Sequence, residues 1–140
     1  MVGVCLGLQG MIEWAGGELG VLPYPQHGKP GTVELVGDGG ILFADMPRQF
    51  QVGRYHSLYS IKEKQPRCLK VTAQTSDGII MGVEHETLPM AAVQFHPESV
   101  QWNGGSDGVP ARSAAAAHAQ GHLVRDVRSH NSRTAGSCAY

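Results

Sequence analysis

Hydrophobic and polar positions divide this chain into two parts that meet near residue 100. In the first part, short apolar runs rich in β-branched residues alternate with turn residues. The runs cover residues 32–36 (TVELV), 69–75 (LKVTAQT), 78–84 (GIIMGVE) and 90–95 (MAAVQF). Runs of this length, bounded by Gly, Pro, Asp and Ser, predict β-strands joined by tight turns. We therefore expect a sheet within the first 100 residues.

Two local signals refine this prediction. Apolar residues at helical spacing extend from Leu6 to Trp14, and the Gly16-Gly17 pair that follows is a natural helix end. The Asp77-Gly78 pair separates two apolar runs and is a strong hairpin signal. We expect one helix directly after the first few residues and a sheet that is at least partly antiparallel.

The pattern changes in the last forty residues. Residues 101–140 consist mostly of Ala, Ser, Gly, Arg and His, with few aliphatic residues. Such a segment cannot bury much apolar surface. We expect residues 1–100 to form a partial domain, and residues 101–140 to be a low-complexity tail that is disordered or foreign to the domain, as a shifted reading frame would produce.

Composition excludes several function classes. The 140 residues carry a formal net charge of -1, so no excess of positive charge predicts binding to nucleic acid or to an anionic membrane. No apolar run approaches the roughly 18 residues of a membrane span, and the N-terminus does not resemble a signal peptide. The three cysteines include no C-x-x-C pair, which argues against a disulfide framework or a zinc knuckle. We expect a cytoplasmic protein.

Cys5 occupies the position of a catalytic nucleophile. It follows the short apolar run 1–4 and precedes the predicted helix, with Gly3 and Gly7 at minus two and plus two, where we expect a side chain to collide with the turn. This G-x-C-x-G pattern is the cysteine form of the nucleophile elbow. The helix start favours the thiolate, and the N–H of Leu6 is placed to bind an oxyanion. Taken alone, the pattern equally fits a small buried residue in a glycine-rich turn.

A thiolate nucleophile needs a base, and His96 is the best candidate. It ends the apolar run 90–95 and is followed by Pro97 and Glu98. Residues at i and i+2 of an extended chain face the same side, so Glu98 can orient the imidazole of His96. A His-Pro-Glu turn can also simply end a strand. The combination of this turn with the elbow favours the catalytic interpretation.

Four segments together carry a family resemblance. GVCLGLQGM, HGKP, VGRYHSLY and VQFHPES occur in the order and at the approximate separations typical of class I glutamine amidotransferases, which use a Cys-His-Glu triad. The amino-acid sequence between these segments is most similar to the amidotransferase part of anthranilate synthase. The resemblance covers about residues 2–100. It implies an α/β fold of the flavodoxin-like amidotransferase type, with a mixed sheet and flanking helices, here incomplete.

The resemblance also implies roles for individual residues. Cys5 would attack the side-chain amide of glutamine, His96 would move the proton, and Glu98 would orient His96. Gln9 would hydrogen-bond the substrate, together with the N–H of Leu6. Ser57 and Leu58 match the segment that holds the amino-acid end of glutamine through backbone groups.

His27 and Lys29 match a segment near the partner interface of the family. They are also explained as solvated residues of a proline-flanked loop, which is the conformation we expect here.

The implied partners are L-glutamine and a chorismate-using synthase domain or subunit, with neither nucleic acid nor a membrane involved. No cofactor is expected for the glutaminase step, and magnesium is expected only in the synthase domain, which is absent. The alternatives are the amidotransferase of aminodeoxychorismate synthase, a different cysteine hydrolase with the same elbow, and a non-catalytic fragment. Family members have several elements before the elbow, including a loop that donates a second oxyanion N–H, so the chain resembles an N-terminally truncated member.

Overall fold

The computed structural model describes residues 1–44 and 46–96 of the chain. The proposed tail, residues 101–140, and Glu98 lie outside the described residues. The elements are β1 (Val2–Val4), α1 (Leu6–Trp14), β2 (Leu19–Leu35), β3 (Gln49–Ser60), a 3-10 turn (Lys62–Lys64), β4 (Leu69–Thr75), β5 (Ile80–His85) and β6 (Ala91–Val93). The predicted helix and the predicted strands near residues 32–36, 69–75, 78–84 and 90–95 are confirmed.

The strands form one mixed sheet in the order β1-β6-β5-β4-β2-β3. β1 and β6 are parallel, and every other neighbouring pair is antiparallel. The predicted Asp77-Gly78 hairpin joins β4 to β5, where Gly78 adopts a φ of 84°. The expected mixed sheet of an α/β domain is therefore confirmed.

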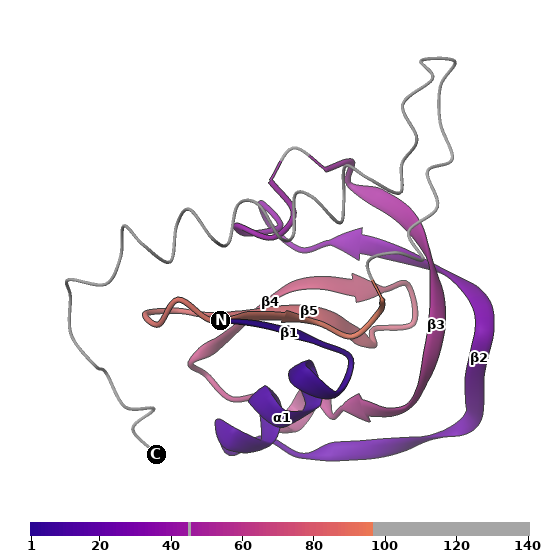
Figure 1. Ribbon diagram of the computed structural model, residues 1–140, viewed down its shortest axis with the longest axis horizontal. Coiled ribbons are helices and arrows are strands. Elements are labelled where there is room, and N and C mark those ends of the chain that lie inside the picture. The colour runs from indigo at the N-terminus through magenta and orange to yellow at the C-terminus, as the bar shows by residue number, and fades with distance from the viewer. Residues whose placement is uncertain (45, 97–140) are drawn as a thin grey trace.

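The sequence did not predict the long pair formed by β2 and β3. Figure 1 shows these strands as a curved pair that extends past the other strands. The expected loop at His27 and Lys29 is wrong, because these residues pair with Tyr55 and Arg54 across the ladder. Proline disfavours strands, but two register shifts interrupt this ladder, and β4 pairs only with residues 33–35 of β2. The proline-rich half of β2 thus lies at a sheet edge, where missing N–H donors are tolerated.

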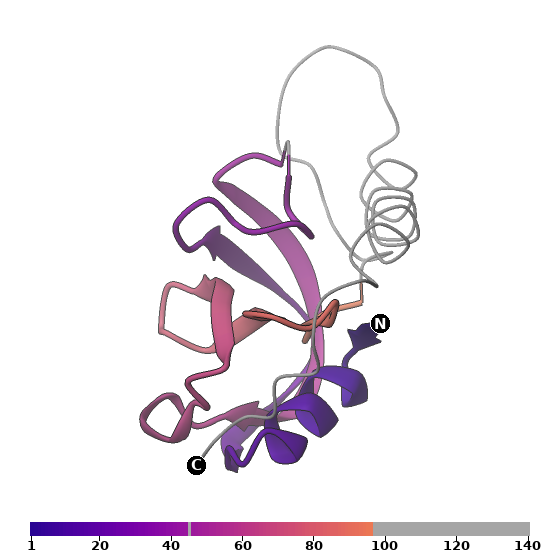
Figure 2. The ribbon, with the colours of Figure 1, turned by 90° about the vertical axis from the view of Figure 1, so that its left-hand side faces the viewer.

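Each face of the sheet has its own hydrophobic core. On one face, α1 contributes Leu8, Met11 and Ile12, which pack against Ile80 and Val83 of β5 and further apolar residues. Figure 2 shows α1 lying along this side of the sheet. On the other face, the three phenylalanines of the chain, Phe43, Phe50 and Phe95, pack together with ring centroids 5.8 to 6.3 Å apart. β6, the strand that precedes His96, contributes to both cores, because Ala92 packs on the side of α1 and Ala91 and Val93 pack on the side of the phenylalanines.

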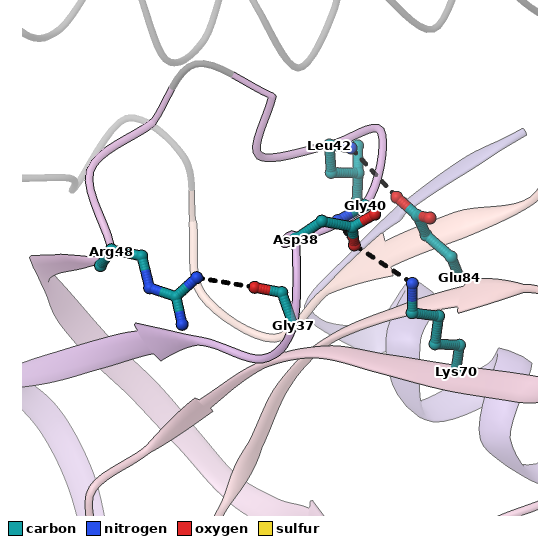
Figure 3. Close-up of polar contacts among 7 residues, drawn as sticks. All are labelled: Gly37, Asp38, Gly40, Leu42, Arg48, Lys70 and Glu84. Carbon is teal, nitrogen blue, oxygen red and sulfur yellow. Dashed lines mark hydrogen bonds and ion pairs between the residues drawn. The ribbon is translucent and has the colours of Figure 1, made fainter.

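Polar contacts fasten the segment between β2 and β3 over β4 and β5 (Figure 3). The carboxylate of Asp38 accepts hydrogen bonds from the N–H of Gly40 (3.0 Å) and from Lys70 Nζ (3.1 Å). These two partners hold the pKa of Asp38 below its ordinary value. Glu84 Oε1 of β5 accepts from the N–H of Leu42 at 3.1 Å. Leu42 and Phe43 of this segment belong to the same core as Phe50 and Phe95.

None of the helices in the described part of the chain is long and apolar enough to cross a bilayer.

Candidate active site

Cys5 lies at the sharp junction between β1 and α1. Its N–H donates to the carbonyl of Val93 (2.8 Å), which extends the pairing of β1 with β6 by one residue. Its own carbonyl accepts from the N–H groups of Leu8 and Gln9 and so begins the helix. Cys5 has φ 54° and ψ -98°, and among the described residues it is the only non-glycine residue with a positive φ. A strained backbone of this kind is held in place by its surroundings and is concentrated at functional sites.

The two glycines that flank Cys5 differ in their roles. A Cβ on Gly3 would lie 2.7 Å from the carbonyl carbon of Gly7, so the expected collision at Gly3 is confirmed. A Cβ on Gly7 would meet nothing within 4 Å, so the expected collision at Gly7 is wrong. The backbone of Gly7 is the obstacle, and Gly3 is the residue that must remain without a side chain.

His96 follows β6 and therefore lies near the same sheet end as Cys5. Val4 and Val93 are paired in parallel register, so Cys5 and Gln94 begin the segments that leave the carboxyl ends of β1 and β6. Ligand sites of open α/β sheets form at such strand ends. The half-buried imidazole of His96 packs edge-on against the ring of Tyr55, with centroids 6.3 Å apart. Glu98, the predicted orienting residue, is outside the described residues.

The contact between Tyr55 and His96 shows how strongly the sheet curves. β3 and β6 are separated by three strands in the sheet order, yet a side chain of β3 reaches the residue that follows β6. Ser57 is two residues after Tyr55 and shares its face of the strand. Ser57 also has no register partner in β2, because the ladder shifts between its neighbours His56 and Leu58. The predicted glutamine-binding segment thus adjoins the residue that contacts His96.

Two glutamine side chains connect α1 to the thiol. Gln9 Nε2 donates to Gln94 Oε1 (3.4 Å), and Gln94 Nε2 donates to Cys5 Sγ (3.7 Å). Both glutamines are buried. Gln9, which was predicted to contact the substrate, therefore already donates a hydrogen bond to Gln94 within the protein. Gln94 was not predicted from the sequence, although a polar residue at a core position of the apolar run 90–95 was the available signal.

His56 fixes the backbone beside Ser57. The ring is 3% exposed, and its Nδ1–H donates to the carbonyl of Leu58 at 2.8 Å. Burial lowers the pKa of His56 below its ordinary value, an effect that the Leu58 hydrogen bond opposes and the charge of Arg54 reinforces. His56 Nε2 and Arg54 Nε are buried without hydrogen-bond partners within the described part of the chain. A neutral His56 is therefore part of the folded state.

We expect stability to fall as the pH is lowered below about 6.5, the ordinary pKa of histidine. The folded-state pKa of His56 is depressed, so the unfolded chain takes up the proton first. The stabilisation is complete above the unfolded pKa and is lost as the pH falls from there towards the folded one. Urea unfolding at about pH 7.5 and about pH 5.5 measures this loss. In His56→Asn, whose amide can keep the bond to Leu58, the loss should be smaller.

The matched control is His27→Asn, which changes an exposed imidazole on β2. It should retain the pH dependence of the parent chain. Equal pH dependence in His56→Asn and the parent would contradict the assignment of this effect to His56.

The structure defines a mixed-sheet α/β domain with a strained cysteine at a strand-to-helix junction, and comparison with known proteins identifies the family. The family model of class I glutamine amidotransferases matches residues 1–110. The chain therefore belongs to the class I glutamine amidotransferase family, as the four sequence segments predicted.

Two relatives of this chain are anthranilate synthases, a narrower group than the family. The chain is 58% identical over 98 residues to an anthranilate synthase of Azospirillum brasilense, covering 70% of this chain and 13% of that protein. It is 46% identical over 101 residues to anthranilate synthase component 2 of Methanocaldococcus jannaschii, covering 71% of this chain and 49% of the relative. The chain thus spans half or less of the length of these two relatives.

A solved structure supports the fold. A glutamine amido transferase from Methylobacillus flagellatus superposes with a TM-score of 0.65 at 14% identity, covering 96% of this chain and 64% of that one. At this identity the likeness concerns the fold alone.

Proposed function

We propose that this chain carries the glutaminase site of an anthranilate synthase. The observation that carries the proposal is the strained Cys5 at the junction of β1 and α1, beside the strand end that leads to His96. The similarity to anthranilate synthases over about 70% of the chain supports the choice among amidotransferases. Cytoplasmic localisation is part of the same proposal.

The chemistry proceeds through a thioester. The thiolate of Cys5 attacks the side-chain amide carbon of glutamine and forms an S–C bond, while the amide oxygen becomes an oxyanion near the N–H of Leu6. The C–N bond breaks, and a proton from His96 leaves with ammonia. His96 then takes a proton from water, whose oxygen attacks the thioester carbon. The C–S bond breaks, and glutamate and the thiolate of Cys5 are released.

The remaining roles follow from position. Glu98 would orient the imidazole of His96. Ser57 and Leu58 would hold the amino-acid end of glutamine, a role that the proximity of Tyr55 to His96 supports. Gln9 retains a second N–H and its carbonyl for the substrate. Ammonia would pass to a chorismate-using synthase, and the exposed His27 and Lys29 would lie near that partner.

Labelling of Cys5 by an electrophilic glutamine analogue tests this proposal. We expect peptide mass spectrometry of the reduced chain to show modification at Cys5 and none above background in Cys5→Ser. Excess glutamine should protect Cys5, because analogue and substrate compete for one pocket. Excess asparagine is the matched control ligand and should protect far less, since its amide is one methylene short of the thiol.

Two outcomes would refute the proposal. Labelling of Cys5 that glutamine does not reduce would indicate a cysteine hydrolase with another substrate. No labelling of Cys5 by the analogue, with normal reaction towards iodoacetamide, would show a chain without a glutamine pocket.

A further inference from the structure

Gln94 is a buried polar residue whose contacts converge on the nucleophile. Its side chain is 1% exposed, and its backbone N–H donates to the carbonyl of Met81 at 2.9 Å. The neighbouring Val93 and Phe95 belong to the phenylalanine core. Burying an amide in such surroundings is unfavourable unless its polar atoms are hydrogen-bonded. The partners of Gln94 therefore indicate what the side chain does.

Its amide is bonded at both ends. Oε1 accepts from Gln9 Nε2 at 3.4 Å, and Nε2 donates to Cys5 Sγ at 3.7 Å. If the Gln94 amide alone were turned over, its NH2 group would face the NH2 group of Gln9, and its carbonyl oxygen would face sulfur. A carbonyl oxygen repels a thiolate, whereas an N–H stabilises it. In the orientation that the structure shows, Gln94 is therefore a donor to the thiol.

We propose that Gln94 is a catalytic residue that stabilises the thiolate of Cys5. The proposal rests on the proposed glutaminase function. Sulfur carries negative charge before the S–C bond forms and again after the C–S bond of the thioester breaks. The N–H of Gln94 faces sulfur in both states. It assists the start of acylation and the departure of sulfur at the end of hydrolysis.

Alkylation of Cys5 by iodoacetamide in the full chain isolates this effect, because the reagent needs no glutamine pocket. In Gln94→Leu, which removes the donor at similar volume, we expect the rate at about pH 7 to fall about tenfold, the value of one hydrogen bond to a charged group. At about pH 10, where an ordinary thiol is ionised, the rate should return to within about twofold of the parent. Recovery at high pH distinguishes a loss of thiolate from a loss of access.

Two further variants keep the test decisive. Gln94→Glu preserves the shape but offers no N–H when ionised, so its rate at about pH 7 should fall at least as far as that of Gln94→Leu. If Gln94→Leu does not unfold cooperatively and is therefore not folded, the alkylation rate of Gln94→Glu decides the test. Thr72→Val is the matched control, since it also replaces a buried polar side chain, in β4, whose Oγ1 has no partner among the described residues. Its rates should equal those of the parent at both pH values.

The outcomes separate this proposal from the proposed function. Parent-like rates in both Gln94 variants at about pH 7, or an equal reduction at both pH values, would overturn the role of Gln94 whatever the substrate. If excess glutamine did not protect Cys5 of the parent chain from the glutamine analogue, the glutaminase proposal would be overturned. The iodoacetamide comparison would still decide whether Gln94 is a donor to sulfur.

Discussion

Gly3→Ala is expected to lower the free energy of unfolding by about 3 kcal/mol, the upper range for overpacking in a tightly packed site. The added Cβ would lie 2.7 Å from the carbonyl carbon of Gly7 and 2.9 Å from its Cα and oxygen. All three atoms are backbone, so no side chain can rotate away. Relief requires β1 to separate from α1, which would also weaken the packing of Leu8 and Ile12. Urea unfolding of the variant and the parent measures the change.

Gly10→Ala provides the control for this substitution. Gly10 lies in α1, the helix that also contains Gly7, and a Cβ there would meet nothing within 4 Å. Alanine is a better helix former than glycine, so this variant should gain up to about 1 kcal/mol. If Gly3→Ala were as stable as the parent, β1 and α1 would not approach each other as closely as the structure shows.

Removal of the Cys5 thiol is expected to abolish labelling at this position completely. The stabilities of the variants should also show that the backbone at residue 5 is strained. Cys5→Ala and Cys5→Gly should both lose all reaction at this position. Of the two, the glycine variant should be more stable by about 1 kcal/mol or more, because Cys5 has a φ of 54° that disfavours any residue with a Cβ. Mass spectrometry measures the first effect and urea unfolding the second.

The order of stability is the informative result. At an ordinary helical position such as Gly10, alanine is more stable than glycine, and at Cys5 the order should be reversed. Greater stability of Cys5→Ala would mean that the junction does not hold residue 5 in a strained conformation.

Local sequence was sufficient for the elements whose signals are local. The helix after Cys5, the hairpin at Asp77-Gly78 and the last apolar run were predicted within a few residues of their observed bounds. The predicted run 32–36 forms the end of β2, but the same signals failed for the rest of β2 and for β3. Prolines and glycines in residues 19–31 favour a loop, and only pairing with β3 along an interrupted ladder makes this segment a strand.

The candidate active site shows the same division between what local sequence predicts and what tertiary contacts decide. The sequence by itself determined the chemical groups: a cysteine at a strand-to-helix corner, a histidine after an apolar strand, and the order of motifs that identifies the family. Only the tertiary structure decided which groups meet. Gln94 lies 89 residues from Cys5 along the chain and 85 from Gln9, and Tyr55 reaches His96 because β2 and β3 curve. Such contacts depend on strand register and sheet curvature, which the packing of the two cores sets and no local pattern encodes.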